Sequence, residues 1–255
     1  MLGVLSSLPA LAAAPKPGEV WREPATGMEF AWVPGGCFDM GCGPWTQDCE
    51  LYEYPVHRVC VDGFWLGRFE VTQDQWRRVM GASPAANQGD GALPVELVSW
   101  HEAKAFAERL SSLGAGVFRL PTEAQWEFAA RSGGRPERFA GGAPEDAAGW
   151  NYENSGGRSH PAGGKAGNGL GLFDMTGNVF EWCADVFDRG FYARSPRNNP
   201  LCTDPGGTPA DWRVRRGGSF GNLARDTRTA MRGKLEPGSR DEFTGLRLLR
   251  EPGGK

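Results

Sequence analysis

Three helix-start signals, each followed after a short interval by glycine, strongly constrain how this chain can fold. In each, a Thr or Ser precedes a Gln or Glu by three residues, a capping box in which the two residues satisfy each other's free amide groups at a helix start. The pairs are Thr72 with Gln75, Ser99 with Glu102, and Thr122 with Gln125. Gly81, Gly114 and Gly133 follow as suitable helix ends. The chain is therefore expected to contain three short helices.

Strand-like segments surround these helices. Alternating or branched apolar residues bounded by Gly, Pro and Asp predict strands at 30–33, 37–40, 57–61, 64–71 and 212–215. The stretch 132–168 is rich in Gly, Ala, Asn and Pro and is expected to be irregular. With 38 Gly and 19 Pro beside 10 Trp and 14 Phe, the sequence favours loops held by aromatic anchors. The predicted class is a loop-rich α+β fold.

Length and charge limit the organisation. Nothing between the motifs resembles a linker, so residues 15–255 are interpreted as one domain. The net charge of -3 offers no basic face for a phosphate backbone, so nucleic acid is not an expected partner. Residues 1–14 are apolar and end in small residues, with Ala10 and Ala12 fitting an A-x-A cleavage pattern, but a basic start is missing. We interpret them as the remnant of a signal peptide in preference to an apolar tail; they are too short to span a bilayer, and no later segment spans it.

Ordered motifs carry a family resemblance over residues 28–250. They are FDMG (38–41), YPVHRVCVDGFWLGRFEVTQDQW (54–76), PVELVSW (94–100), FRLPTEAQWEFAAR (118–131), GNGLGLFDMTGNVFEW (167–182), VRRGGSF (214–220) and GLRLLR (245–250). Together they resemble the formylglycine-generating enzyme family, also called the sulfatase-modifying factor family. The resemblance implies a fold that is related to C-type lectins and has little regular secondary structure.

The family's oxidases hold copper on two cysteines just beyond the RGGS motif and convert a sulfatase cysteine to formylglycine. The matching positions here are Asn222 and Thr227, and no cysteine follows Cys202. Soft Cu(I) prefers sulfur ligands to an amide and a hydroxyl. Copper is therefore not an expected cofactor, and the protein is not expected to be a formylglycine-generating oxidase.

Six cysteines suit an oxidising compartment, so a periplasmic or secreted location is expected. The preferred pairing joins Cys37 to Cys60, Cys42 to Cys49, and Cys183 to Cys202, although six cysteines allow fifteen connectivities. A zinc site on the four N-terminal cysteines is the alternative, but the usual C-x2-C pairs are missing.

The family resemblance also implies a calcium site. In the family, calcium is held at positions that match Asp174, Gly177, Val179 and Glu181, the two middle ones through their carbonyls. Calcium prefers such oxygen ligands, so it is the expected cofactor. The alternative is that Asp174 and Glu181 only cap and bridge a buried loop. A second family calcium site is expected to be lost, because the stretch 154–161 is too short for it.

The segment after the RGGS motif is the candidate ligand groove. Gly217 and Gly218 are interpreted as a structural turn, whereas residues 220–244 match the floor of the family's substrate groove. The groove candidates are Ser219, Asn222, Arg225, Asp226, Thr227, Arg228 and Arg232. Arginines there could attract a carboxylate or an acidic peptide. Equally, they could form surface ion pairs with Asp226, Glu236, Asp241 and Glu242.

The three histidines, His57, His101 and His160, are scattered along the chain and are not expected to bind metal.

The leading hypothesis is an exported, disulfide-bridged, calcium-stabilised domain that acts as a binding or accessory protein. Its partner would be an unknown protein, peptide or small molecule. One alternative is an enzyme of different chemistry on the same scaffold, such as periplasmic maturation of a secondary metabolite. The other is a retroelement-diversified ligand-binding protein, like the variable proteins among the family's relatives.

Overall fold

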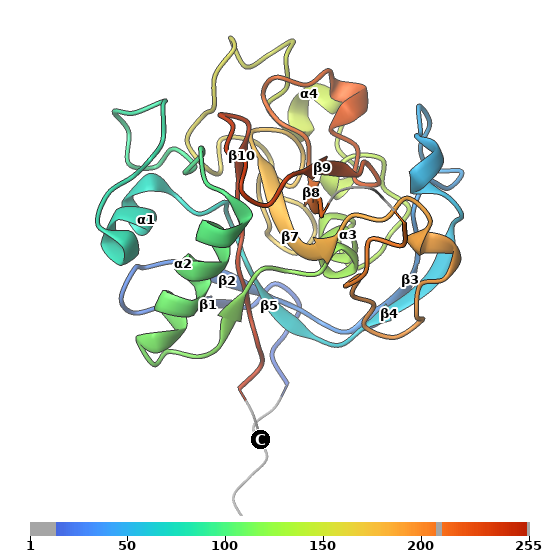
Figure 1. Ribbon diagram of the computed structural model, residues 1–255, viewed down its shortest axis with the longest axis horizontal. Helices are drawn as coiled ribbons and strands as arrows, with labels where there is room; N and C mark the ends of the chain where they lie inside the picture. Colours follow the sequence, from blue (N-terminus) through green and yellow to red (C-terminus); the bar gives the residue numbers. More distant parts are fainter. Residues whose placement is uncertain (1–13, 208–210, 254–255) are drawn as a thin grey trace, which may run out of the picture.

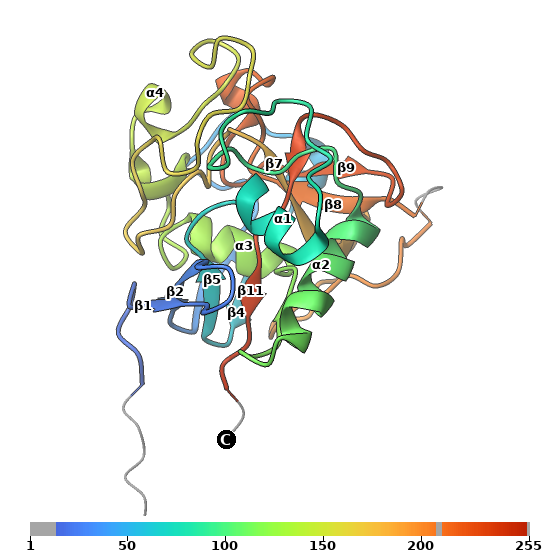
Figure 2. The same cartoon turned by 90° about the vertical axis from the view of Figure 1, so that its left-hand side faces the viewer.

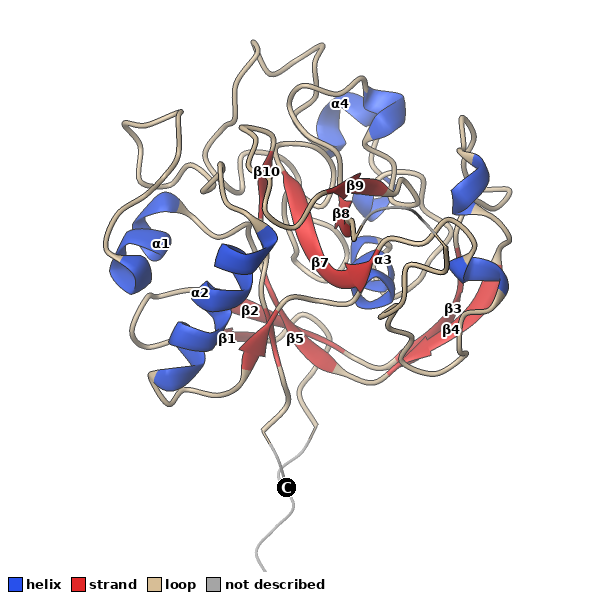
Figure 3. Cartoon of the chain, viewed as in Figure 1, coloured by secondary structure: helices blue, strands red, loops and turns tan. Residues whose placement is uncertain are grey.

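The structure is a computed structural model that describes residues 14–207 and 211–253 (Figure 1). The predicted signal peptide remnant, residues 1–14, lies outside the described residues except for Ala14. Only 19% of the residues are helical and 20% are in strands, so loops form most of the molecule (Figure 3). The predicted loop-rich α+β class is therefore confirmed.

A five-stranded sheet gathers both ends of the described chain. Its strands are β1 (Val20–Arg22), β2 (Glu29–Val33), β5 (Phe64–Gly67), β11 (Leu249–Arg250) and β6 (Phe118–Arg119), in the order β1-β2-β5-β11-β6. All its neighbouring pairs are antiparallel. The first and last described residues therefore lie at the same end of the molecule (Figure 2).

A four-stranded sheet carries the motifs of the C-terminal half. Its strands are β7 (Phe180–Val186), β8 (Arg213–Arg216), β9 (Gly233–Leu235) and β10 (Thr244–Gly245), in the order β10-β7-β8-β9. Only β10 and β7 are parallel. A separate hairpin pairs β3 (Gly36–Met40) with β4 (His57–Val61). The predicted strands are thus confirmed, except that the strand expected at 64–71 ends at Gly67.

Three helices begin where the capping boxes predict: α1 (Gln73–Met80), α2 (Trp100–Ser112) and α3 (Glu123–Ala130). The single turn α4 (Glu145–Ala148) has no side-chain cap and was not predicted. Thr72, Ser99 and Thr122 each accept a bond from the amide three residues later. Short 3-10 turns complete the set: η1 (Leu51–Glu53), η2 (Ala140–Gly142), η3 (Phe191–Ala193) and η4 (Ala224–Asp226). The stretch 132–168, expected to be irregular, contains η2 and α4.

Helix α3 is the centre of the core. It lies between the β3–β4 hairpin and the β7–β8 pair (Figure 1), and all eight of its residues are buried. Trp126 and Phe128 supply its apolar contacts. A second cluster lies under α1 and α2, where Trp76 stacks on Phe106 with ring centroids 4.9 Å apart. These two clusters fix the scaffold from which the loops project.

Two of the three predicted disulfides are present. Cys37 and Cys60 lie opposite each other on β3 and β4 and are bonded, and Cys42 bonds Cys49. The four N-terminal cysteines are all in these two bridges, so they have no free thiolates for the alternative zinc site. They also indicate an extracytoplasmic protein, because disulfides persist in oxidising compartments. Among the residues described, no helix has the length and apolar character needed to cross a membrane.

The predicted bridge between Cys183 and Cys202 is wrong: both cysteines are free and buried. Cys202 pairs through its backbone with Asp185 and Val186, beyond Cys183 along β7. The Cys183 sulfur lies 3.9 Å from the carbonyl of Glu181, and the Cys202 sulfur lies 3.2 Å from that of Asp204. The two thiols therefore face different backbone groups. Burial raises the pKa of Cys183, and it raises the pKa of Cys202 to about 11.

Candidate ligand-binding face and its supporting ion pairs

The RGGSF segment is a tight turn at the end of β8. Gly217 and Gly218 have φ angles of 94° and 74°, which side-chain-bearing residues rarely adopt. A Cβ on Gly218 would lie 2.7 Å from the Asp226 carbonyl oxygen and from Thr227 Cγ2. The turn therefore needs glycine so that the 224–227 segment can pack directly against it.

The two positions that match the copper cysteines are bonded within their own loop. Asn222 Oδ1 accepts hydrogen bonds from the backbone N–H and the hydroxyl of Ser219, at 3.0 and 2.7 Å. The Thr227 hydroxyl is buried and donates to the Ala224 carbonyl at 2.9 Å. The Ser219 hydroxyl also accepts from Gly221 N–H, at 3.3 Å. These side chains stabilise the turn, and none of these partners is a base that could activate Ser219 as a nucleophile.

Loops from three parts of the sequence meet at this turn. Tyr152 N–H donates to the Asn222 carbonyl, and the Ser155 hydroxyl donates to the Phe220 carbonyl. Phe220 also packs on Phe243, with ring centroids 5.0 Å apart. Residues 150–158, 219–227 and 241–243 together are called the apical face, which lies at the top of Figure 1 near α4 and η4. Tyr152 is 65% exposed and Leu223 is 37% exposed, so the apical face presents apolar side chains to solvent.

Two of the predicted groove arginines are not on the surface. Arg228 donates to both oxygens of Glu53, at 2.8 and 3.0 Å, and Arg232 donates to both oxygens of Glu123, at 2.7 and 2.8 Å. Each arginine has a relative exposure of only 1%. Both predictions for Arg228 and Arg232, groove residue and surface ion pair, are therefore wrong. A buried guanidinium needs a buried partner, and distant segments supply it.

The remaining charged candidates stay at the surface. Arg225 is exposed and lies 4.0 Å from Asp226, so this pair matches the surface ion-pair interpretation. Arg240 instead pairs with Glu102 at 2.7 Å, and Asp241 pairs with Arg215 at 2.7 Å. Arg225 and Asp226 are thus the charged groove candidates that the structure leaves accessible.

Sequence reasoning missed the carboxylates of α3. Glu123 and Glu127 are both buried, and Arg216, from the RGGS motif, lies between them and pairs with Glu127. Glu127 also binds Arg131 at 3.1 Å. Burial alone would raise the pKa of Glu123, but the charges of Arg232 and Arg216 outweigh it and hold that pKa below its ordinary value. The sequence contains a signal for these ion pairs: helix α3 has two glutamates one turn apart, and the motif at 214–220 has two adjacent arginines.

The predicted calcium residues come together in a buried, acidic environment. Asp174 accepts from Gly163 N–H through Oδ2 at 2.6 Å, whereas its Oδ1 is buried and has no partner within the described part of the chain. Glu181 accepts a forked pair of bonds from Arg247 and one bond from Trp126. Burial raises the pKa of Asp174 to about 6, and the charge of Glu181 adds to the effect.

A third carboxylate, Glu70, belongs to the same cluster. It accepts bonds from the Asn178 side chain and from Val179 N–H. Burial, followed by the charges of Asp174 and Glu181, raises its pKa well above the ordinary value. Arg247 binds Glu181, and its charge also lowers the pKa values of Glu70 and Asp174. The ligand oxygens of these three carboxylates do not all lie within 4.8 Å of one another. Within the described residues, Asp174 Oδ1 is the oxygen of this group that is buried and has no hydrogen-bond partner.

The three histidines lie in separate places. His57 is on β4 and contacts Tyr192 with the two rings tilted by 49°, and His101 is on α2. His160 stacks on Trp150 at a centroid distance of 3.8 Å, in the loop beside the apical face.

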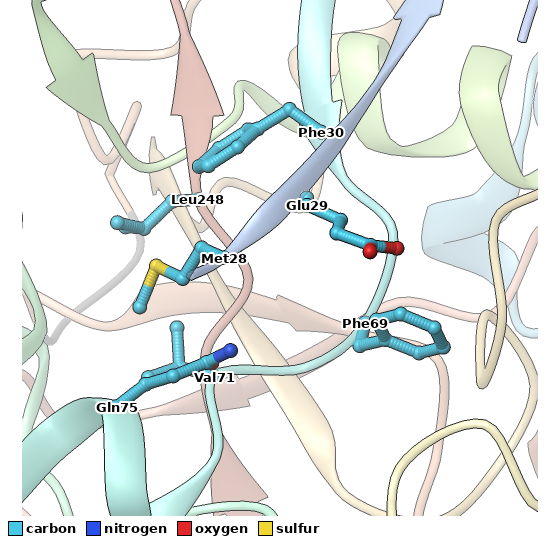
Figure 4. Close-up of a pocket in the computed structure, with 8 residues that line it drawn as sticks. Met28, Glu29, Phe30, Phe69, Val71, Gln75 and Leu248 are labelled. Atoms are coloured by element: carbon cyan, nitrogen blue, oxygen red, sulfur yellow. The ribbon is translucent and has the colours of Figure 1, made fainter. Parts of the chain in front are cut away.

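Cavities occur both at the apical face and far from it. One of about 260 Å³ adjoins Phe220 and Glu242. Another, of about 490 Å³, lies beside Phe64 and Leu249, near where the chain leaves β11. A third, between Met28, Phe30 and Leu248, is shown in Figure 4. Its volume of about 10 Å³ suits at most one water molecule.

The model of the sulfatase-modifying factor enzyme 1-like domain matches residues 16–252. The chain belongs to this family. A formylglycine-generating enzyme of Thermomonospora curvata is 33% identical, covering 91% of this chain and 95% of that protein. The chaperone protein LppX of Paenibacillus barcinonensis is 27% identical, covering 77% and 83%. The kinase Pkn1 of Chlamydia trachomatis is 29% identical over 88% of this chain, which spans only 38% of Pkn1.

Two solved structures share the fold. Treponema denticola variable protein 1 superposes with a TM-score of 0.74 at 26% identity, covering 92% of this chain and 99% of that one. PvdO from Pseudomonas aeruginosa superposes with a TM-score of 0.80 at 24% identity, covering 94% and 100%. The resemblance seen in the sequence motifs therefore extends over nearly the whole chain.

Proposed function

We propose that this protein is an exported binding or accessory domain of the sulfatase-modifying factor family, and that it is not a copper-dependent cysteine oxidase. The observation that carries the proposal is the chemistry at the two positions expected to hold copper. Asn222 and Thr227 offer an amide and a hydroxyl, both of which are already bonded within the loop. Cu(I) is held by thiolates, and these oxygen groups are poor substitutes.

The apical face is the proposed binding surface. Its exposed Tyr152 and Leu223 lie on loops that the core holds in place, an arrangement suited to recognition because loop residues can vary without disturbing the scaffold. Aromatic side chains are common anchors of protein interfaces. Similarity to a variable protein of Treponema denticola and to a protein named as a chaperone supports a binding role.

The test is an aldehyde assay. Purified protein is incubated with a cysteine-containing sulfatase peptide, Cu(I), oxygen and a reductant, and the peptide mass is followed, with the Thermomonospora curvata enzyme as the positive control. No aldehyde product is expected from this protein. Conversion of the cysteine above the rate of a copper-only blank would contradict the proposal.

An enzyme of different chemistry remains the second candidate. The observation in its favour is the cavity of about 260 Å³ beside Phe220, because Glu96 in its wall is buried and its pKa is raised by burial. Carboxylates with raised pKa values in cavities are typical of active sites as well as of binding sites. A diversified receptor, the third candidate, requires a near-duplicate of the 3′ end of the gene nearby, differing chiefly at adenines.

We also propose that calcium binds at Asp174 and Glu181. Asp174 Oδ1 would be a direct ligand, supported by the carbonyl groups of Gly177 and Val179. The cation would neutralise the excess carboxylate charge, which is costly when buried. Its role would be structural: it would hold the 174–181 segment against the RGGS turn. Gly177 N–H in that segment donates a hydrogen bond to the Gly217 carbonyl in the turn.

A periplasmic or secreted location is part of the same proposal. The two disulfides support it, since both close loops in the N-terminal third of the chain. Fractionation of the native host, followed by immunoblotting, tests it: the protein is expected outside the cytoplasm.

A further inference from the structure

The cavity beside the apical face contains charged groups that form no ion pair with any other described residue. About 260 Å³ in volume, it is lined by Asn87, Glu96, Arg158, Ser159, Phe220 and Glu242, among others. Drug-sized ligands occupy pockets of roughly 300–1,000 Å³, so this cavity suits a smaller molecule. Its residues come from four separate parts of the chain, 86–96, 157–159, 220 and 242, which the core brings together.

Glu96 is the fixed acid of this cavity. It is 1% exposed, and its two oxygens accept hydrogen bonds from Ala86 N–H at 3.1 Å and Asn87 N–H at 2.9 Å. These bonds fix the direction of the carboxylate. The Asn87 amide in turn donates to the Ser159 hydroxyl at 2.9 Å, which ties the segment that carries Arg158 to the same wall.

Buried glutamates in this structure are of two kinds. Glu53, Glu123, Glu127 and Glu181 each bind a buried arginine. Glu23, Glu70 and Glu96 are buried but form no ion pair with any residue in 14–207 or 211–253. Of these three, Glu96 lines the cavity of about 260 Å³. A buried carboxylate without a counter-ion carries a cost that a cation bound in that cavity would offset.

Side chains of both charges line the rim of the cavity. Glu242 and Arg158 are exposed and line the same cavity, and neither forms an ion pair within the described residues. Burial raises the pKa of Glu96, and the nearby charge of Glu242 raises it further by a smaller amount. The cavity therefore offers two carboxylates to a cation and one guanidinium to an anion.

The larger cavity of about 490 Å³ lacks this property. Its Arg119 binds Glu251 at 3.0 Å, and its Asp62 accepts from Asn199 at 2.8 Å. The polar groups there satisfy one another, so they are not left for a ligand.

We propose that the cavity beside the apical face binds a small zwitterion, a molecule that carries one ammonium and one carboxylate group. The ammonium lies between Glu96 and Glu242, the carboxylate binds Arg158, and the apolar chain between them rests on Phe220. Charge-assisted bonds of this kind are the strong ones in binding sites. This inference rests on the proposed binding function and names the ligand class for the same part of the surface.

Calorimetric titration with matched probes tests the proposal. Glycine, 4-aminobutyrate and 6-aminohexanoate vary the spacing of the two charges, while butylamine and butyrate each retain one charge of 4-aminobutyrate. At least one of the three zwitterions is expected to bind with a millimolar or lower Kd. It should bind about tenfold more tightly than either single-charge probe, since each lost charge contact costs roughly 1.4 kcal/mol.

Substitutions at the rim assign the contacts. Glu242→Gln is expected to weaken the zwitterion and butylamine about tenfold and leave butyrate no weaker. Arg158→Gln should weaken the zwitterion and butyrate but not butylamine. Both residues are exposed, so neither variant should disturb folding; Glu108→Gln and Arg22→Gln, distant exposed positions, are the charge-matched controls. Amide NMR shifts of Ala86, Asn87 and Ser159 should report the wild-type binding.

The proposal is overturned if no zwitterion binds, if butylamine binds as tightly as every zwitterion, or if Arg158→Gln and Glu242→Gln behave like the controls. The aldehyde assay is independent of these titrations. A protein that binds no zwitterion yet forms no aldehyde would refute only the ligand class, whereas aldehyde formation would refute the proposed function itself.

Discussion

Replacing Asp174 by Asn should stabilise the calcium-free protein, although it removes a charged group that is buried in the native state. The reason is Asp174 Oδ1, which is buried and accepts no hydrogen bond from any described residue. An Asn side chain can keep the acceptor for Gly163 N–H and replaces the second oxygen by a neutral group. The substitution therefore removes charge while preserving shape.

The magnitude follows from the pKa of Asp174. Burial raises it from 3.8 to about 6, and each pK unit corresponds to about 1.4 kcal/mol. The ionised carboxylate thus destabilises the native state by up to about 3 kcal/mol above pH 6. Because the folded pKa is the higher one, this cost is absent well below pH 3.8, develops between pH 3.8 and about 6, and is complete above pH 6.

Urea unfolding of wild type and Asp174→Asn in EDTA, at several pH values from 4 to 8, measures this effect. The variant should be more stable by up to about 3 kcal/mol at pH 8, and the difference should vanish near pH 4. Calcium at about one thousand times its Kd should reverse the order, since it stabilises the wild type by about 4.1 kcal/mol. Glu145→Gln, at an exposed position, controls for net charge.

Two results would refute the reasoning. If Asp174→Asn lowers stability in EDTA by the same amount at every pH, the carboxylate is not a buried, uncompensated charge. If calcium stabilises the variant as much as the wild type, the cation does not bind at Asp174.

The remaining predictions concern the ion pairs and the thiols. Arg232→Gln leaves Glu123 buried without its partner and should lower the free energy of unfolding in urea by about 3–5 kcal/mol. Arg240→Gln, at the surface, should lower it by less than about 1 kcal/mol. Equal losses in the two variants would contradict the buried placement of Arg232. Thiol titration should find no reactive cysteine in the native protein and two in denaturant, Cys183 and Cys202. If the denatured protein has no reactive thiol, these two cysteines are disulfide-bonded and the structure is wrong on this point.

Local signals in the sequence predicted the scaffold well because they depend on neighbouring residues. Each capping box involves residues only three apart, and each marks the start of a helix in the structure. The strands followed from apolar alternation, and Cys37 and Cys60 were paired correctly on neighbouring strands. The family motifs then supplied the fold as a whole, which local patterns alone do not specify.

Partnerships between distant residues could not be predicted in this way. Arg228 finds Glu53 across 175 positions, and Arg232 finds Glu123 across 109. Nothing near either arginine in the sequence distinguishes it from the exposed Arg225. The unpaired state of Glu96 was equally hidden, since it depends on which cations the fold brings near it.

Cu(I) competition titration against a chromogenic chelator tests the central claim most directly. The wild-type protein is expected to leave copper with the chelator, because Asn222 and Thr227 provide no thiolate. The double variant Asn222→Cys and Thr227→Cys should gain one tight Cu(I) site, which shows that the loop geometry itself is intact. A tight copper site in the wild type that is lost when Asn222 and Thr227 are replaced by Ala would contradict the account.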